Sequence, residues 1–310
     1  MADISVKLGA LELPSPVMAA SGTFGFGLEY RDVLDYNKLG AIVTKGVSLK
    51  PREGNPMPRI VETPCGMLNS IGLQNPGVES FVGDLLPQVK GLGVPIIVNV
   101  FGETVEEYVR VAEMIQSTGA VAGVELNVSC PNVKCGGIHF GANPEMLHEV
   151  TKAVREVTDL HLMVKLSPEA AVIEAVSNAA EQAGADSLSA INTIRGMSIN
   201  IETRKPRIAT TTGGLSGPAL KPLAVRMVWE ASRSVSIPVV GIGGISTAMD
   251  AIEFIIAGAS AVQVGTANYT NPRACEEIAD GIAVYLEERD IPKLSDIVGS
   301  VEVYEDYTLK

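Results

Sequence analysis

The sequence predicts an α/β fold, and within that class a (β/α)8 TIM barrel. Eight short runs rich in β-branched residues alternate with amphipathic stretches of helical period, a pattern typical of βα units around a parallel sheet. Hydrophobic residues make up 46% of the chain but aromatic residues only 5%, so small branched side chains must fill the core, as they do in barrels. Barrels of about 250 residues or more fold as one unit, so residues 1–310 are expected to form a single domain. An open, doubly wound sheet is the alternative.

Each expected strand ends in polar or glycine residues. The eight strands are expected at 16–22, 40–46, 95–102, 123–131, 161–168, 186–193, 237–244 and 260–266. In the helix expected over 104–119, Thr104 can cap the first turn and Gly119 can end the helix. In the helix over 143–157, Asn143 precedes a proline at the first turn. Further helices are expected over 169–183, 218–235 and 247–257.

Three segments do not fit the bare repeat. Residues 3–13 alternate like a small hairpin, which we expect to close the bottom of the barrel. Residues 47–80 and 194–217 are long Gly/Pro-rich insertions after the second and sixth strands. Insertions at these places lie on the active-site face of a barrel, so they are expected to be binding loops.

The charge of the chain argues against a nucleic-acid partner. The formal net charge of −12 repels phosphate backbones, and the only basic cluster is TRKPR at 203–207. The N-terminal segment MADISVKLGALEL alternates like a strand and does not resemble a signal peptide. No apolar run approaches the ~20 residues of a membrane span. We therefore expect a soluble, cytoplasmic protein without a membrane partner.

The four cysteines predict neither a disulfide framework nor a metal site. Cys65, Cys130, Cys135 and Cys275 do not form the pattern of a small secreted protein, and Cys130 and Cys135 share a C-x4-C spacing without a C-x2-C beside it. The histidines have no ligand spacing either. Redox chemistry would therefore need an organic cofactor or another subunit.

The carboxyl ends of barrel strands surround the active site, so the residue types there indicate the chemistry. The expected ends contain lysines, asparagines, small residues and one cysteine, without a carboxylate: Ser21, Lys45, Asn99, Asn127, Cys130, Lys165, Asn192, Thr193, Gly243, Gly244, Gly265 and Thr266. Glycoside hydrolysis uses paired carboxylates, and divalent metal ions prefer carboxylate or histidine ligands, so neither is predicted. Amide side chains suit a flat heterocycle edged with C=O and N–H groups.

Glycines after the last two strands, together with two lysines, favour a phosphorylated cofactor. In GIGGIST and QVGTANYT the glycines expose backbone N–H groups where barrels often bind phosphate, although Gly243 and Gly244 alone would also serve a simple turn. Lys45 and Lys165 lie in apolar strands. Three interpretations of each lysine stay open. It could form a Schiff base, it could be a fixed cation facing a developing anion such as a reduced flavin, or it could merely extend to solvent.

Cys130 follows the fourth strand directly. An isolated cysteine is usually a small buried hydrophobe, but its place at a strand end, ahead of PNVKCGG, favours a functional thiol. A thiol with an ordinary pKa of about 8.5 can act as a general base where its surroundings stabilise the thiolate. Gly136 and Gly137 offer hinges for a loop that closes over substrate.

Nine motifs follow one another over nearly the whole chain. They are ASGTFGFG (20–27), GNPMPR (54–59), MLNSIGLQNPG (67–77), ELNVSCPNVKCGG (125–137), VKLSP (164–168), INT (191–193), TGGLSGPALKP (212–222), GIGGI (241–245) and GTANYTNP (265–272). Together they resemble the class 1 dihydroorotate dehydrogenases, and within them the B-type (NAD-linked) catalytic subunit. The cysteine at 130, where the similar membrane-associated class 2 enzymes have serine, is what places the resemblance in class 1.

The resemblance implies an FMN-binding barrel that oxidises (S)-dihydroorotate to orotate in pyrimidine (UMP) biosynthesis. Cys130 would remove the C5 proton while the C6 hydride passes to the flavin. Substrate would be held by Lys45, Asn69, Ser70, Ile71, Gly72, Leu73, Asn127, Asn192 and Thr193. FMN would be held by Ser21, Lys45, Gly46, Asn99, Asn127, Lys165, Ile191, Gly217, Gly243, Gly244, Gly265 and Thr266, the last four around its phosphate.

The B-type resemblance also implies partners: a second subunit that carries FAD and a 2Fe-2S cluster and passes electrons to NAD, with a homodimer of this chain at the centre of a heterotetramer. The chain has no G-x-G-x-x-G fingerprint that opens a helix, which is consistent with electrons leaving through such a partner.

Several rival functions stay open at this point. Fumarate-using A-type enzymes share most of the site with the B-type. A flavin barrel that reduces a pyrimidine, such as dihydropyrimidine dehydrogenase or a dihydrouridine synthase, is a second candidate. A Schiff-base lyase or aldolase and a non-catalytic scaffold are candidates from different classes.

Overall fold

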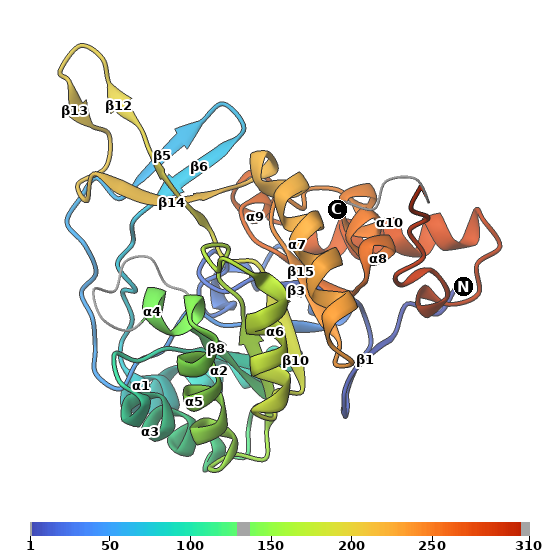
Figure 1. Cartoon of the computed structure of the whole chain (residues 1–310), viewed down its shortest axis with the longest axis horizontal. Helices are drawn as coiled ribbons and strands as arrows, with labels where there is room; N and C mark the ends of the chain where they lie inside the picture. Colours follow the sequence, from blue (N-terminus) through green and yellow to red (C-terminus); the bar gives the residue numbers. More distant parts are fainter. Residues whose placement is uncertain (1, 129–136, 305–310) are drawn as a thin grey trace.

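Eight parallel strands close into the barrel that the sequence predicts (Figure 1). The computed structural model describes residues 2–128 and 137–304. The strands are β3 (Val17–Ala19), β4 (Ala41–Val43), β7 (Ile96–Val100), β8 (Gly123–Asn127), β9 (His161–Lys165), β10 (Ser187–Ala190), β15 (Val239–Ile242) and β16 (Ala259–Val264). Pairing of β16 with β3 completes the ring. Each strand overlaps one of the predicted runs, so the predicted barrel is confirmed.

Helices between the strands cover the outside of the barrel (Figure 1). They are α3 (Val105–Gln116), α5 (Pro144–Arg155), α6 (Ile173–Gln182), α7 (Lys221–Ser234), α8 (Ala248–Ala257) and α10 (Ala274–Glu287). The predicted caps are confirmed, because Thr104 accepts from the N–H of Glu107 and Asn143 accepts from the N–H groups of Glu145 and Met146. Helix α10 was not predicted from the sequence. Within the described ranges, no helix combines the length and apolar character needed to cross a membrane.

Shorter helical pieces fill the connections. They are α1 (Val78–Ser80), the π-helix η3 (Phe81–Leu85), α2 (Leu86–Lys90), α4 (Gly137–Ala142) and α9 (Ala267–Thr270), with the 3-10 turns η1 (Leu28–Tyr30), η2 (Tyr36–Lys38), η4 (Pro218–Leu220) and η5 (Leu294–Ile297). Pieces this short leave no clear helical period, so the sequence pattern does not separate them from loops.

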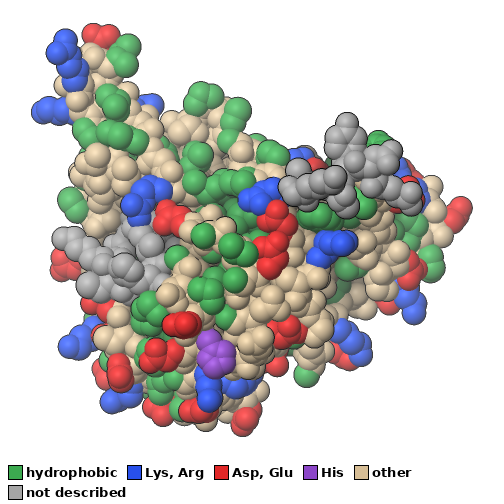
Figure 2. Space-filling model, in the orientation of Figure 1, with side chains coloured by type: hydrophobic (Ala, Val, Ile, Leu, Met, Phe, Trp, Pro, Cys, Tyr) green, Lys and Arg blue, Asp and Glu red, His purple; other side chains and the backbone are tan. Residues whose placement is uncertain are grey.

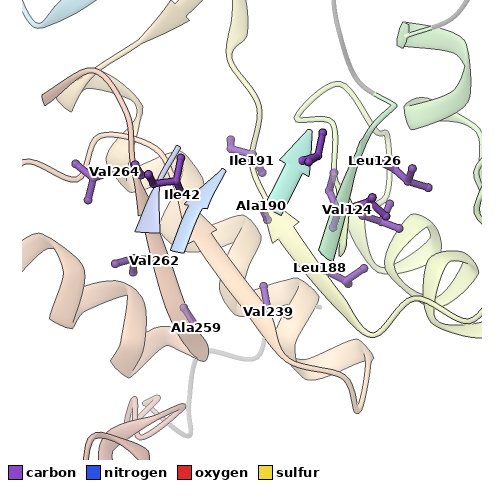
Figure 3. Close-up of a cluster of buried hydrophobic side chains, with 14 of the residues drawn as sticks. Ile42, Val124, Leu126, Leu188, Ala190, Ile191, Val239, Ala259, Val262 and Val264 are labelled. Carbon is purple, nitrogen blue, oxygen red and sulfur yellow. The ribbon is translucent and has the colours of Figure 1, made fainter. Parts of the chain in front are cut away.

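Alternate residues of each barrel strand face opposite ways. Val124 and Leu126 of β8 belong to the large core between the strands and the helices, as do the other side chains labelled in Figure 3. Glu125 and Asn127 of the same strand instead reach side chains of other strands across the interior of the barrel. The interior of the barrel is therefore partly polar, and that polar part lies toward the carboxyl ends of the strands.

An N-terminal hairpin closes the opposite end, as predicted. Strands β1 (Val6–Leu8) and β2 (Leu11–Leu13) pair antiparallel. Leu8 and Leu13 are fully or almost fully buried and form one cluster with interior side chains of the barrel, namely Met18, Ala41, Val43, Ile97, Met163, Val240 and Ala261. Burial of each large aliphatic side chain stabilises the fold by about 1.5–3 kcal/mol. An apolar plug therefore fills the bottom of the barrel.

The two predicted insertions form a second sheet. Strands β5 (Ile60–Thr63), β6 (Gly66–Asn69), β14 (Thr212–Ser216) and β11 (Ile194–Met197) pair in the order β11-β14-β6-β5, and β12 (Ile199–Asn200) pairs with β13 (Lys205–Pro206) in a separate hairpin. In Figure 1 these strands project from the barrel at the upper left, and Figure 2 shows basic and hydrophobic side chains at their tip. The prediction of loops was incomplete, because register pairs such as Asn69 with Gly214 join distant segments.

Candidate active site

A pocket lies between the carboxyl ends of the barrel strands and the second sheet. It encloses about 1190 Å³ of space between protein atoms, part of it open to solvent. Its walls include Asn69 of β6 and Ser216 of β14 as well as residues from the barrel strands. The predicted site residues that line it are Ser21, Lys45, Gly46, Asn69, Ile71, Gly72, Leu73, Asn99, Asn127, Lys165, Ile191, Asn192, Thr193, Gly217, Gly243, Gly244, Gly265 and Thr266. The structure therefore brings almost the whole predicted set together.

Two predicted residues are not among this lining. Ser70 is fully buried, and its hydroxyl has no hydrogen-bond partner in the part of the chain that the structure describes. Its backbone N–H donates to the carbonyl of Arg59, and its carbonyl accepts from Asn55. Ser70 thus holds the chain beside Asn69 and Ile71 and does not form part of the pocket wall. Cys130 lies outside the described residues, as does Cys135.

Three asparagines form a hydrogen-bonded row on the pocket wall. Nδ2 of Asn192 donates to Oδ1 of Asn127 over 3.3 Å, and Nδ2 of Asn127 makes a longer contact of 3.5 Å to Oδ1 of Asn99. The row continues at its far end, where Oδ1 of Asn192 accepts from the backbone N–H of Thr193 over 2.8 Å. The hydroxyl of Tyr108 donates to the carbonyl of Asn127 over 2.9 Å and fixes the end of β8. A row of this kind presents donors and acceptors to the edge of a flat polar ring.

Lys165 reaches the same wall from β9. It is 5% exposed, and its Nζ donates to Oγ of Ser21 over 3.1 Å. The nearest carboxylate is that of Glu125, with Oε1 3.9 Å away. Glu125 does not line the pocket, but it lies two residues before Asn127 and therefore on the same face of β8.

Lys45, from the loop that follows β4, also lines the pocket. Burial lowers the pKa of Lys45, and the positive charge of Arg59 lowers it further, while Glu29 acts weakly in the opposite direction. Among the described residues, no carboxylate forms an ion pair with its ammonium group, so this lysine is available to an anion in the pocket. Arg59 itself was not predicted as a site residue, although it ends the GNPMPR motif.

The opposite edge of the pocket is rich in glycine. Gly244 has φ +74°, and a Cβ there would lie 2.8 Å from the backbone N of Lys221 and 3.0 Å from the carbonyl of Gly217. At Gly265 the nearest protein atoms would lie 3.6 Å from an added Cβ, which would therefore occupy the pocket. Thr266 beside it donates from Oγ1 to Oγ of Ser216 over 2.8 Å. Backbone N–H groups that no side chain covers, next to hydroxyl groups, can bind a phosphate.

Several lining residues were not predicted. Gly22, Thr23, Met67, Ser216 and Tyr269 all line the pocket. Gly22 and Thr23 belong to the ASGTFGFG motif and Tyr269 to GTANYTNP, so the motifs carried a signal for them. Met67 and Ser216 come from β6 and β14, whose position above the barrel depends on long-range pairing that no local pattern shows.

Comparisons with known proteins agree with this geometry. The family described as "Dihydroorotate dehydrogenase" matches residues 3–286. A protein of Pelobacter propionicus named "Dihydroorotate dehydrogenase B (NAD(+)), catalytic subunit" is 55% identical over 300 residues, which is 97% of this chain and 99% of the relative. One of the same name from Geotalea uraniireducens is 53% identical over 299 residues, 96% of this chain and 98% of the relative. In the crystal structure of DHODH in complex with ferulenol from Eimeria tenella, the chain matches with a TM-score of 0.80 at 21% identity, over 96% of this chain and 88% of that one; this likeness concerns the fold.

Proposed function

The chain belongs to the dihydroorotate dehydrogenase family, and from that premise we propose that it is an NAD-linked catalytic subunit that oxidises (S)-dihydroorotate to orotate in pyrimidine biosynthesis. The observation that carries the proposal is the pocket, which places four asparagine amides, two lysines and a glycine-rich edge around one space. The amides suit the C=O and N–H edge of a pyrimidine ring. Lys45, which forms no ion pair with a carboxylate among the described residues, suits the carboxylate of the substrate. Residues 1–310 are proposed to act as one FMN-binding domain in the cytoplasm.

FMN fits the residues present. The bare backbone of Gly243, Gly244 and Gly265, with the hydroxyl of Thr266, would hold the phosphate. Ser21, Gly46, Asn99, Lys165, Ile191 and Gly217 would contact the rest of the cofactor. The chemistry that a bound flavin supplies is acceptance of the hydride from C6 of dihydroorotate. An ammonium group held in a nearly dry wall, as that of Lys165 is, stabilises negative charge that develops beside it.

The remaining steps belong to side chains of this chain. We propose that Cys130 takes the C5 proton, since it follows Asn127 by three residues in the sequence. Asn127 and Asn192 would orient the substrate ring, with Asn69, Thr193 and the backbone of Ile71 to Leu73 completing its site. Lys45 would bind the anionic substrate and also reach the flavin. Ser70 is retained only as a support for this segment, because its side chain is buried away from the pocket wall.

The electron acceptor is part of the proposal. The relatives are named as NAD(+) enzymes and as catalytic subunits, which favours NAD over fumarate and favours a second subunit. We propose that this partner carries FAD and a 2Fe-2S cluster and docks on a homodimer of this chain. Native mass spectrometry of the co-expressed subunits would test the assembly. Electron transfer to NAD only in the presence of the partner would test the route, and reduction of fumarate by the isolated chain would point to an A-type enzyme instead.

The test of the reaction is an anaerobic titration of the purified chain. A flavin spectrum that dihydroorotate bleaches near-stoichiometrically is the expected result, with orotate as the product. A flavin spectrum that dihydroorotate leaves unchanged would support the flavin-binding barrel but contradict dihydroorotate as the substrate. Absence of flavin after gentle purification, with trapping of a carbonyl substrate by borohydride at Lys45 or Lys165, would instead support the Schiff-base lyase.

A further inference from the structure

A fully buried carboxylate lies directly beneath the pocket. Glu125 is 0% exposed and accepts three hydrogen bonds from neutral donors. Nδ2 of Asn99 donates to Oε1 over 2.7 Å, and both Oγ of Ser189 and Nε2 of Gln263 donate to Oε2 over 2.8 Å. Donors thus face both oxygens, which suits an ionised carboxylate.

Glu125 lies at the boundary between the apolar plug and the pocket. Gln263, which donates to it, also lies 3.5 Å from Sδ of Met163, a member of the plug. Asn99 and Lys165, its neighbours on the other side, line the pocket, whereas Glu125 does not. An ion in so dry a place costs several kcal/mol to bury, so its retention there calls for a role that an apolar residue could not fill.

The hydrogen bonds of Glu125 determine how the neighbouring asparagine amides are oriented. Because Nδ2 of Asn99 is committed to Glu125, Oδ1 of Asn99 is left to face Nδ2 of Asn127. Oδ1 of Asn127 then accepts from Asn192, and Oδ1 of Asn192 accepts from the backbone of Thr193. All three amides therefore point their N–H groups toward Glu125 and their oxygens away from it. A carboxylate can only accept and a backbone N–H can only donate, whereas an amide can turn over, so Glu125 at one end and the N–H of Thr193 at the other together fix this direction.

We infer that Glu125 is a positioning residue whose carboxylate holds the Asn99 end of the amide row Asn99–Asn127–Asn192 in its direction, as the N–H of Thr193 holds the far end. Through Asn99 it maintains the pattern of donors and acceptors that the substrate meets. The inference deepens the proposed function and rests on it. A substrate edge whose donors and acceptors match one direction of the row is mismatched to the opposite direction, and each buried mismatch leaves a polar group without a partner. Glu125 thereby contributes to the choice of pyrimidine without touching it.

The discriminating pair of variants is Glu125→Gln and Glu125→Met. In Glu125→Gln the new carbonyl can still accept from Asn99, and its NH2 group can donate to Oε1 of Gln263 once that amide turns over. Oε1 of Gln263 is buried and has no partner among the described residues. The rearrangement gives Oε1 a partner and moves Nε2 to the place that Oε1 occupied. Glu125→Met keeps a similar volume but offers Asn99 no comparable acceptor. Nδ2 of Asn99 is then buried without a partner, or Asn99 turns over and sets its Nδ2 against Nδ2 of Asn127.

The readout is the dissociation constant of orotate, measured by calorimetry on the flavin-loaded chain. Turnover is less informative, because loss of charge in Glu125→Gln also acts on Lys165, 3.9 Å away. We expect the dissociation constant of Glu125→Gln to stay within about threefold of the unsubstituted chain and that of Glu125→Met to rise by about tenfold or more, the effect of one buried unpaired polar group. Ser187→Ala is the matched control, because Ser187 also lies inside the barrel on β10 but pairs with His161. Its orotate affinity should be unchanged.

The outcomes separate the inference from the proposed function. Equal orotate affinity of Glu125→Met and the unsubstituted chain would overturn the inference and leave the function standing. Parallel loss of affinity and thermal stability in both Glu125 variants would also overturn it, since a merely structural role predicts no rescue by glutamine. If Glu125→Met does not fold, Glu125→Asp replaces it: the shorter side chain keeps the charge but withdraws the acceptor from Asn99, so weaker binding than in Glu125→Gln is expected and equal binding contradicts the inference. If the unsubstituted flavin-loaded chain binds no orotate, the proposed function fails and the inference with it.

Discussion

The guanidinium of Arg59 lies close enough to Lys45 to add to the effect of burial and lower the pKa of that lysine. The charged form of Lys45 is therefore less favoured than that of an exposed lysine, and an anion in the pocket raises the pKa again. We expect orotate to bind most tightly below the lowered pKa of Lys45, with affinity falling as pH rises through that pKa and one proton taken up on binding in that window. Calorimetry in two buffers of different ionisation enthalpy measures the proton. Lys45→Met should bind orotate weakly at every pH, and its affinity should not fall further as pH rises. A fall in orotate affinity at alkaline pH that persists in Lys45→Met would assign this pH dependence to another group.

Removal of the proposed base should separate cofactor binding from turnover. Cys130→Ala is expected to retain FMN and to lose about 10²- to 10⁴-fold in dihydroorotate oxidation near neutral pH, the usual contribution of a general base. Stopped-flow measurement of flavin bleaching gives the rate directly. Cys135→Ala, five residues away in the same segment, is the control and should bleach at the normal rate. Normal bleaching in Cys130→Ala would remove this thiol from the mechanism.

Gly265 offers a test of the phosphate edge. A methyl group there meets no protein atom closer than 3.6 Å, so Gly265→Ala should fold with stability unchanged to within about 0.5 kcal/mol when flavin is absent. The methyl group fills space that the phosphate would need, so FMN affinity should drop by roughly tenfold or more, in line with an overpacking cost of about 1–3 kcal/mol. Fluorescence titration of the apoprotein measures the affinity. Gly83→Ala, where an added Cβ meets no atom within 4 Å, is the control. Equal FMN affinity of the two variants would show that the phosphate does not bind beside Gly265.

A histidine at the lower end of the barrel predicts loss of stability in mild acid. Burial lowers the pKa of His161 from 6.5 to about 4, with Asp186 opposing and Arg155 reinforcing the shift, and its Nε2 lies 2.7 Å from Oγ of Ser187. The unfolded chain therefore binds the proton first, so the stability is present above about pH 6.5 and is lost as pH falls toward 4. Between pH 7 and pH 5 the loss should be about 2 kcal/mol.

Urea unfolding at the two pH values measures this loss. His161→Gln should remove about that much of the difference, because glutamine takes up no proton in this range. His148→Gln, on the surface-covering helix α5, is the control and should keep the slope of the unsubstituted chain. An equal slope in both variants would assign the acid sensitivity to carboxylates elsewhere.

The barrel could be predicted because its information is local. Runs such as 95–102 carry β-branched residues and end in a polar turn, and Thr104 and Asn143 mark helix starts within a few residues. The second sheet could not be predicted in the same way. The sequence of β14 is TGGLS, which has no strand-like alternation, and it becomes a strand only by pairing with β6 and β11.

Site residues could be predicted where they stand at the ends of strands in the sequence. They could not be predicted where their role depends on contacts across the interior of the barrel. Lys165 and Asn127 follow from their place at strand ends. Glu125 shares a face with Asn127, so the alternation already placed it inside the barrel, but its partners Ser189 and Gln263 come from β10 and β16 and are brought to it only by closure of the barrel. The thiol of Cys130 remains a prediction, since it lies outside the described residues.

The hairpin at the bottom of the barrel also bears on where substrate enters and product leaves. Since Leu8 and Leu13 fill that end, we expect dihydroorotate and orotate to use the same side of the barrel, where the pocket lies beside β6 and β14. On this expectation the product leaves before the next substrate molecule binds, and a partner protein that covered this side of the pocket would block both. We therefore expect an electron-transfer subunit to dock on the side of the barrel, away from the open side of the pocket.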